Sequence, residues 1–212
     1  MNGILIAVEG IDGSGKSTLV KYIEDELKKE GRQVARVATR EMEKEPIFQA
    51  VVDGYSLDPH SPAYMFFFQL LHAHKADRAR RALEEGMIVV TDRWDLSFFV
   101  WHESFGFFSK KSDELRRGIS RIAFGDLKPH LGLYLDVSVD KALDRRMFGR
   151  GDVISDVKAE KQLYTKVVTA YKSLAKRYGW ITIDANDGFE QVQKMARKLV
   201  QEVVKQNAPP EQ

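Results

Sequence analysis

Short apolar runs alternate with longer amphipathic segments along the chain. The apolar runs are nearly continuous, which is typical of strands covered on both faces of a sheet, and they lie at residues 4–8, 34–38, 87–91, 131–137 and 181–183. Between them apolar residues recur at helical spacing, as Leu19, Ile23 and Leu27 do. Pro62 is placed to begin a long helix that Gly86 ends. This alternation predicts an α/β protein with a parallel sheet.

The pattern indicates one domain over residues 1–206. The chain has 212 residues, which can bury a single substantial core, and neither a repeat nor a long linker divides it. The tail at 207–212 contains two prolines, and we expect it to be disordered.

The amino-acid composition argues against several classes of protein and excludes some kinds of site. The chain has 33 Lys and Arg against 31 Asp and Glu, a net charge of +2 that argues against an obligate nucleic-acid binder. It has no cysteine, which excludes disulfides, thiolate zinc sites and thiol nucleophiles. The apolar run near Met1 is too short to span a membrane and no signal peptide is visible, so we expect a cytoplasmic protein.

A phosphate-binding motif connects the first strand to the first helix. Residues 10–17, GIDGSGKS, match G-x-x-x-x-G-K-[ST] in the strand–helix context that this motif requires. The glycines allow successive backbone N–H groups to face phosphates, and the helix N-terminus favours negative charge. Lys16 can reach the β- and γ-phosphates, and the Ser17 hydroxyl can ligate Mg²⁺. We assign nucleotide binding to Gly10, Asp12, Gly13, Ser14, Gly15, Lys16, Ser17 and Thr18.

An acid and a base follow the third predicted strand. Asp92 and Arg93 stand where a strand of a doubly wound sheet opens toward the ligand crevice. Asp92 could belong to a magnesium site together with Ser17, and Arg93 could bind the phosphate of an acceptor. The alternative is a structural ion pair at the end of a strand. The sequence contains neither an Asn-Lys-x-Asp segment nor an Asp-x-x-Gly switch after this strand, which argues against a GTPase.

Five segments together resemble the thymidylate kinase family, and the resemblance covers nearly the whole chain. They are VEGIDGSGKST at 8–18, TRE at 39–41, DRWDLS at 92–97, LYLDV at 133–137 and DRRMFGR at 144–150. The resemblance implies a P-loop fold of three layers, α/β/α, whose five-stranded parallel sheet has the order 2-3-1-4-5 and helices on both faces. It also implies a homodimer, a mobile lid at about 144–156, and transfer of phosphate from ATP, with Mg²⁺, to dTMP, giving dTDP.

The resemblance also implies an acceptor site. Asp12 would approach the sugar hydroxyl, Arg40 and Arg93 would bind the acceptor phosphate, Phe67 would stack on the base and His102 would contact its edge. Two departures affect this site. Met42-Glu43-Lys44 replaces the family's Pro-Gly-Gly after Arg40, and the family's base-contacting arginine falls on Leu71, which cannot donate a hydrogen bond.

Phosphoryl transfer also needs cations at the transferred group. Lys16 and Arg93 are candidates, with Asp92 as their acidic neighbour, and the lid adds Arg145, Arg146 and Arg150. These three arginines could instead form a solvated helix end. The sequence does not decide which of them would act.

Two other functions remain open. One is a kinase of the same fold for another nucleoside monophosphate or for a deoxynucleoside, whose hydroxyl would need Glu9 or Asp92 as a base. The other is a regulatory P-loop ATPase or GTPase, against which the missing switch and base-reading motifs count.

Overall fold

A computed structural model describes residues 3–42, 44–46, 48–49, 61–104 and 113–207, apart from the side chains of Arg40 and Asp113. Residues 208–212 of the predicted disordered tail lie outside this part of the chain. Five parallel strands form one sheet in the order β2-β3-β1-β4-β5, which confirms the predicted fold class and strand order. The strands are β1 (Ile4–Glu9), β2 (Val34–Arg36), β3 (Ile88–Asp92), β4 (Leu131–Asp136) and β5 (Ile181–Asp184).

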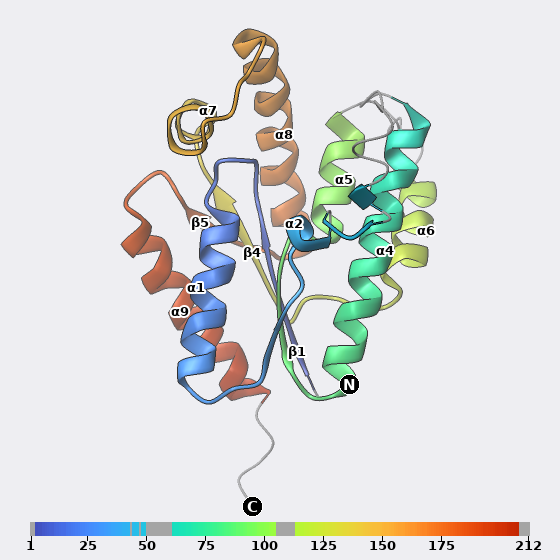
Figure 1. Cartoon of the computed structure of the whole chain (residues 1–212), viewed down its shortest axis with the longest axis vertical. Helices are drawn as coiled ribbons and strands as arrows, with labels where there is room; N and C mark the ends of the chain where they lie inside the picture. The colour runs from blue at the N-terminus through green and yellow to red at the C-terminus, as the bar shows by residue number, and fades with distance from the viewer. Residues whose placement is uncertain (1–2, 43, 47, 50–60, 105–112, 208–212) are drawn as a thin grey trace, which may run out of the picture.

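Helices cover both faces of this sheet (Figure 1). On one face, α1 packs against β1, β2 and β3, and α9 packs against β4, β5 and α1. On the other face, α4 and α8 contact the sheet, while α5 packs on α8 and α6 packs on α4. These helices are α1 (Lys16–Lys29), α4 (Pro62–Glu84), α5 (Asp95–Ser104), α6 (Asp113–Phe124), α8 (Val157–Tyr178) and α9 (Phe189–Gln206), and three shorter ones are α2 (Thr39–Met42), α7 (Val139–Asp144) and the π-helix η2 (Arg145–Gly149).

Local signals account for the ends of the long helix α4. The Ser61 hydroxyl accepts a hydrogen bond from the backbone N–H of Tyr64 at 3.2 Å, and Pro62 occupies the first turn, where its missing N–H costs nothing. Gly86 follows the helix with φ +80, a conformation that favours glycine.

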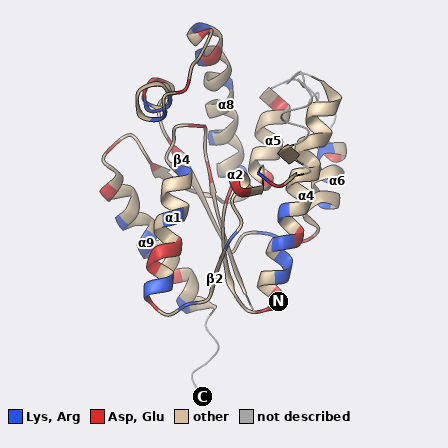
Figure 2. Ribbon diagram, in the orientation of Figure 1, with Lys and Arg blue, Asp and Glu red and all other residues tan. Residues whose placement is uncertain are grey.

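Charges of both signs are interspersed on α1 and α9, whereas the part of α4 beside α5 carries none (Figure 2).

The register of the sheet sets the positions of the two predicted motifs. Val8 is the partner of Asp92 in the β1–β3 pair, and the Arg93 N–H donates to the Val8 carbonyl at 2.9 Å. Both strands are fully buried, so their carboxyl ends are held rigidly side by side. The phosphate loop and the Asp92–Arg93 turn therefore leave the sheet at the same edge. Within the described residues, no helix has both the length and the apolarity needed to cross a membrane.

Candidate active site

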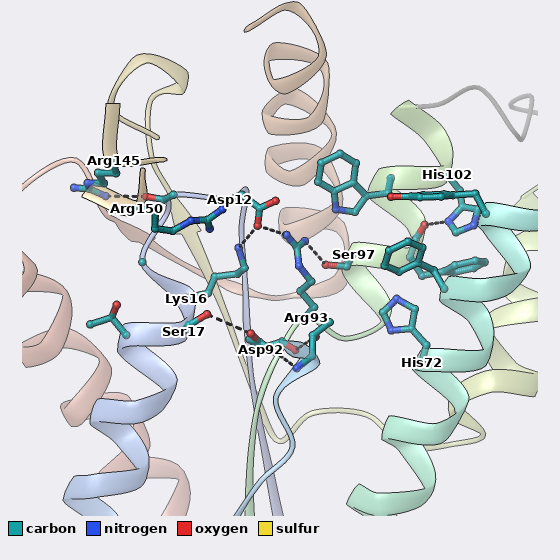
Figure 3. A pocket seen from close by; sticks show the side chains of 18 of the residues that line it. Asp12, Lys16, Ser17, His72, Asp92, Arg93, Ser97, His102, Arg145 and Arg150 are labelled. Atoms are coloured by element: carbon teal, nitrogen blue, oxygen red, sulfur yellow. Dashed lines mark hydrogen bonds and ion pairs between the residues drawn. The ribbon is translucent and has the colours of Figure 1, made fainter. Parts of the chain in front are cut away.

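A cavity of about 700 Å³ opens at the carboxyl ends of β1 and β3. Figure 3 shows cationic side chains gathered toward one side of it and imidazole and aromatic rings toward the other. The phosphate-loop side is lined by Asp12, Gly13, Gly15, Lys16, Ser17, Thr18, Arg145, Gly149 and Arg150, and the other side by Tyr64, Met65, Phe68, His72, Phe98, Trp101 and His102, with Thr39, Asp92, Arg93 and Ser97 between them.

The phosphate loop depends on the conformations of its glycines. Gly13 has φ +83, and a Cβ there would lie 2.2 Å from the carbonyl oxygen of Ala142 in α7. Gly15, at φ +95, directs the chain into α1. Gly10 and Ser14 do not line the cavity. The Ser14 hydroxyl lies buried within the loop, 2.8 Å from where a Cβ on Gly10 would be, so these two residues shape the loop from behind.

Lys16 lies at the base of the cavity with its ammonium group turned into the loop. Its Nζ donates to the carbonyl of Ile11 at 2.8 Å and lies 3.7 Å from Asp12 Oδ1. Burial and the nearby Arg93 lower the pKa of Lys16 to about 8, although Asp12 and Asp92 oppose this shift. An anion entering the loop would add negative charge beside this ammonium and keep it protonated.

Ser17 and Asp92 form a site that suits magnesium. The Ser17 hydroxyl lies 3.4 Å from Asp92 Oδ2, while Oδ1 accepts from the Thr39 N–H at 2.7 Å. Burial alone would raise the pKa of Asp92, but Lys75, the Thr39 N–H, Lys16 and Arg93 lower it below its ordinary value, so the carboxylate is ionised. Mg²⁺ prefers oxygen ligands and keeps water and phosphate oxygens in its shell, so this hydroxyl–carboxylate pair fits it. No group of three or more acidic, His or Cys residues that could hold a metal occurs in the described part of the chain.

Arg93 occupies the centre of the cavity in an unusual backbone conformation. Its φ is +55, in the left-handed region that residues other than glycine rarely adopt. The guanidinium donates to Asp12 Oδ1 at 2.6 Å and to the Ser97 hydroxyl at 3.3 Å, and it lies 5.7 Å from the ring centre of Trp101. Such a turn persists because the surroundings hold it, and it aims the guanidinium into the cavity.

Two buried charged residues hold the Arg93 turn. Neither of them was expected in this role from the sequence. Lys75 is fully buried in α4, and its Nζ donates to the Thr39 hydroxyl at 2.9 Å and to the carbonyls of Asp92 and Arg93 at 2.5 and 2.8 Å. A signal for it was available, since Lys75 lies four residues after Leu71 and four before Ala79, on a face that is otherwise apolar.

Glu9, at the end of β1, is the second of these residues. Its carboxylate accepts hydrogen bonds from the backbone N–H groups of Trp94 and Ser97 at 2.6 and 2.9 Å, and also from the hydroxyls of Ser97 and Tyr171. It is wholly buried and bonded to α5 and α8, so it fixes Ser97 next to Arg93. Because its oxygens are occupied in this way, Glu9 is poorly placed to act as a base for an acceptor hydroxyl.

On the helix α4, the residues that face the cavity are one position beyond those that the family resemblance indicated. Phe68 and His72 line the cavity, whereas Phe67 packs against Phe48 and Phe68 with ring centres 5.9 and 5.4 Å away. Leu71 is fully buried in the core. The predicted stacking residue Phe67 is thus replaced in the cavity by Phe68. The reason is the register of α4, because successive helical positions lie on different faces.

Two histidines line this half of the cavity. His102 lines it as expected, and its Nδ1 lies 2.5 Å from the carbonyl of Phe98. Burial, together with Arg116 and despite the Phe98 carbonyl, lowers the pKa of His102 to about 4. Burial, Lys75, His102 and Arg93 hold the pKa of His72 well below its ordinary value. Both imidazoles are therefore neutral at physiological pH.

The three lid arginines have different surroundings. Arg145 donates to the carbonyls of Gly13 and Ala185 at 3.4 and 3.0 Å and lines the cavity. Arg150 also lines the cavity, and it is paired with Asp152. Arg146 does not line it.

Arg146 is bonded instead to Asp152, to Glu160 and, at 2.7 Å, to the Tyr164 hydroxyl of α8. Tyr164 in turn donates to Asp12 Oδ2 at 3.3 Å, which connects the lid to the phosphate loop. Arg40 lies in α2, and its side chain is outside the described part of the structure.

Comparison with known proteins agrees with this geometry. The sequence model of the thymidylate kinase family matches residues 8–196. The thymidylate kinase of Symbiobacterium thermophilum is 31% identical over 209 residues, 95% of this chain and 94% of its own length. That of Caldanaerobacter subterraneus is 30% identical over 97% of this chain and 98% of its own, and that of Bacillus licheniformis is 26% identical over 98% and 99%. These matches confirm the predicted enzyme class, a nucleoside monophosphate kinase, and the chain belongs to the thymidylate kinase family.

Proposed function

We propose that this protein transfers the γ-phosphoryl group of ATP to dTMP and releases dTDP and ADP. The observation that carries the proposal is a single cavity onto which a phosphate loop, a buried arginine and an uncharged aromatic subsite all open. A triphosphate and a nucleoside monophosphate can therefore be held at once. The family match supports thymidylate as the acceptor.

The triphosphate would occupy the loop between β1 and α1. The N–H groups around Gly13 and Gly15 and the ammonium group of Lys16 would hold its β- and γ-phosphates. Ser17 and Asp92 would hold Mg²⁺, which when bound neutralises phosphate charge and fixes the orientation of the phosphates. Residues of this chain thus position the transferable group beside Arg93.

The acceptor phosphate would bind at Arg93, and Arg40 stays its second predicted contact. One of its oxygens attacks the γ-phosphorus in line, the bond from that phosphorus to the bridging oxygen breaks, and ADP leaves with the electron pair. The attacking oxygen is already ionised at neutral pH, so no general base is required. Asp12, which is bonded to Arg93, is placed to contact the sugar.

Among the lid arginines, we propose Arg150 as the cation that stabilises the transferred group. It lines the cavity and is paired with Asp152 of the same lid, so it can move with the lid. Arg145 would act beside the nucleotide, since it is bonded to the carbonyl of Gly13. Arg146 would hold the lid to α8.

We also propose that residues 1–206 fold as one kinase domain and that two copies assemble as a homodimer. The mutually packed helices α4 and α6 expose Phe66, Leu70, Leu115 and Ile122, with Ile122 as much as 86% exposed. Light scattering of the purified protein measures the assembly directly, and replacement of Leu70 and Ile122 by Lys should give monomers.

A coupled assay of ADP release tests the proposed reaction. MgATP would be supplied with dTMP, other nucleoside monophosphates or thymidine, each in turn. We expect strong stimulation by dTMP and dTDP as its product. Stimulation by thymidine with no effect of dTMP would indicate a nucleoside kinase, and ATP turnover that no acceptor changes would indicate a regulatory ATPase.

A further inference from the structure

The imidazole of His72 lies in the acceptor half of the cavity without a hydrogen-bond partner. It points from α4 into the cavity (Figure 3), four residues after Phe68, which lines the same space. Only 5% of His72 is exposed. Its ring centre lies 5.4 Å from that of Phe124, so the ring is packed against an aromatic residue of the core.

The lack of a partner distinguishes His72 from the other histidines in the described residues. His130 Nδ1 accepts from the Leu5 N–H, His74 Nε2 is bonded to Glu45, and His102 Nδ1 to the Phe98 carbonyl. The His72 imidazole has no such partner at either nitrogen; its Nδ1 is enclosed by protein, so Nε2 is the nitrogen that a ligand in the cavity can reach. Buried polar groups are nearly always hydrogen-bonded, so an unpartnered one beside a cavity indicates that a ligand completes its bonding.

The position of His72 indicates which part of the ligand this would be. The cations Lys16, Arg145 and Arg150 lie on the other side of the cavity, and Arg93 lies between them and His72 (Figure 3). The residues of α4 and α5 that line the cavity beside His72 are uncharged, which suits a planar base more than a phosphate.

We propose that His72 hydrogen-bonds the edge of the acceptor's base and thereby sets which bases the enzyme accepts. This inference rests on the proposed function, because it assumes that the aromatic half of the cavity receives a nucleoside monophosphate. A neutral imidazole carries one donor and one acceptor nitrogen, whereas an arginine carries donors only. The ring can therefore meet a carbonyl or an exocyclic amine, and its influence must appear as a preference between bases.

A pair of substitutions separates this role from a packing role. His72→Leu removes both nitrogens, and His72→Gln keeps a donor and an acceptor on a side chain of similar length. We would measure kcat/KM for dTMP and for dCMP, together with the KM for ATP and the thermal midpoint. A site that loses a hydrogen bond to a base changes discrimination by about 10- to 100-fold.

We expect His72→Leu to lower kcat/KM for the preferred base by about 10- to 100-fold and to bring the dTMP/dCMP ratio at least fivefold closer to one. His72→Gln should keep the ratio closer to that of the wild-type enzyme, and the KM for ATP should stay within twofold. A folded His72→Leu enzyme with an unchanged ratio, or equal losses in both variants, would overturn the proposal.

A measurement on the unmodified protein keeps the inference testable if a variant does not fold. The ¹⁵N resonances of the His72 ring should move on addition of dTMP, because a new hydrogen bond changes the shielding of the bonded nitrogen. Unchanged resonances at saturating dTMP would refute the contact. Absence of transfer to every monophosphate would instead count against the proposed function, and a nucleotide-induced shift would still support His72 as a base contact.

Discussion

The two halves of the cavity are built from different parts of the chain. On the phosphate side, most of the groups that face the ligand come from one loop and from the ends of two adjacent buried strands, β1 and β3, and the lid after α7 adds Arg145 and Arg150. On the acceptor-base side they come from single faces of two helices, α4 and α5. The first half can be located from residue spacing alone, and the second depends on how each helix is rotated about its axis.

This difference explains where the site is rigid and where its chemistry can vary. The phosphate side uses backbone geometry, positive φ angles and buried ionic groups, so few substitutions are compatible with it. The base side uses side chains at helical positions, where one residue can replace another without disturbing the backbone. We therefore expect changes on the phosphate side to affect every acceptor equally and changes on the base side to affect the choice among acceptors.

Replacement of Lys16 should have the largest effect. Lys16→Ala should lower kcat about 100- to 1000-fold for all acceptors, because the loop loses the cation that faces the transferred group. Lys21→Ala is the control, since Lys21 is an exposed residue of α1 paired with Asp25. Steady-state kinetics and circular dichroism check the result. Normal turnover in folded Lys16→Ala would contradict the assignment of the phosphate loop.

Arg93→Ala should mainly affect the acceptor. Loss of the guanidinium removes the bonds to Asp12 and Ser97 and, by our proposal, the contact with the acceptor phosphate. We expect kcat/KM to fall about 10- to 100-fold for dTMP and dCMP alike, while the KM for ATP changes little. A fall for only one of these acceptors would place Arg93 on the base side of the cavity and contradict its role at the acceptor phosphate.

Lys75→Met tests the support of the Arg93 turn. The substitution has similar volume but leaves the carbonyls of Asp92 and Arg93 without their shared donor. Buried groups that lose a charged partner cost about 3 kcal/mol, so the midpoint of urea unfolding should fall clearly. Lys28→Met, at an exposed residue of α1, is the control. The KM for dTMP should also rise; if stability and this KM both stay normal, the turn does not need Lys75.

Gly13→Ala tests the contact between the phosphate loop and α7. A Cβ at Gly13 would meet the Ala142 carbonyl at 2.2 Å in a backbone with φ +83, whereas Gly31, with φ +75, has open space around it. Both substitutions introduce the strain of a positive φ, about 1 kcal/mol, and only Gly13→Ala adds the collision. We expect a further loss of about 1–2 kcal/mol and slower transfer in that variant. Equal thermal midpoints would refute this packing.

The smallest effect concerns pH and Asp95, at the start of α5. Burial, with help from Glu9, raises the pKa of Asp95 from 3.8 to about 7. Between these values the folded state holds a proton that the unfolded state has released, so the free energy of unfolding falls as pH rises from about 4 to 7. A pKa raised by about three corresponds to about 4 kcal/mol. Asp95 is only half-buried, however, so the stability of Asp95→Asn relative to wild type should increase across this window by about half of that or less, about 1–2 kcal/mol. Urea titrations at several pH values check this; a constant difference would contradict the raised pKa.

The sequence predicted the phosphate side of the cavity better than the acceptor-base side. The five strands and the long helix α4 agree with expectation, because continuous apolar runs and the signals at Pro62 and Gly86 act locally, and the strand order agrees with what the family resemblance implied. The predicted neighbours Ser17 and Asp92 do lie together, since adjacent parallel strands end at one edge of the sheet. Their roles in catalysis, like those of all the site residues, stay predictions.

Contacts between distant elements were not predictable in this way. Lys75 bonds to Thr39 and to the carbonyl of Asp92; its place on an apolar helical face hints at burial, but nothing local names these partners. The choice of Phe68 and His72 over Phe67 and Leu71 is a rotation of one helical position, about 100 degrees, which a motif aligned by counting residues cannot resolve.

By itself, the sequence of this protein determined the family, the order of the strands and the location of phosphate chemistry. The phosphate chemistry and the strands follow from local rules, namely glycines that allow a loop, apolar runs that make buried strands, and motif residues at strand ends, while the strand order followed from the resemblance of these motifs to a family. Only the tertiary structure decided which face of α4 meets the cavity, how Arg93 is held, and which lid arginines face it. These depend on packing among helices that are distant in sequence, where the free energy of burial selects one arrangement of side chains from several that local pattern allows.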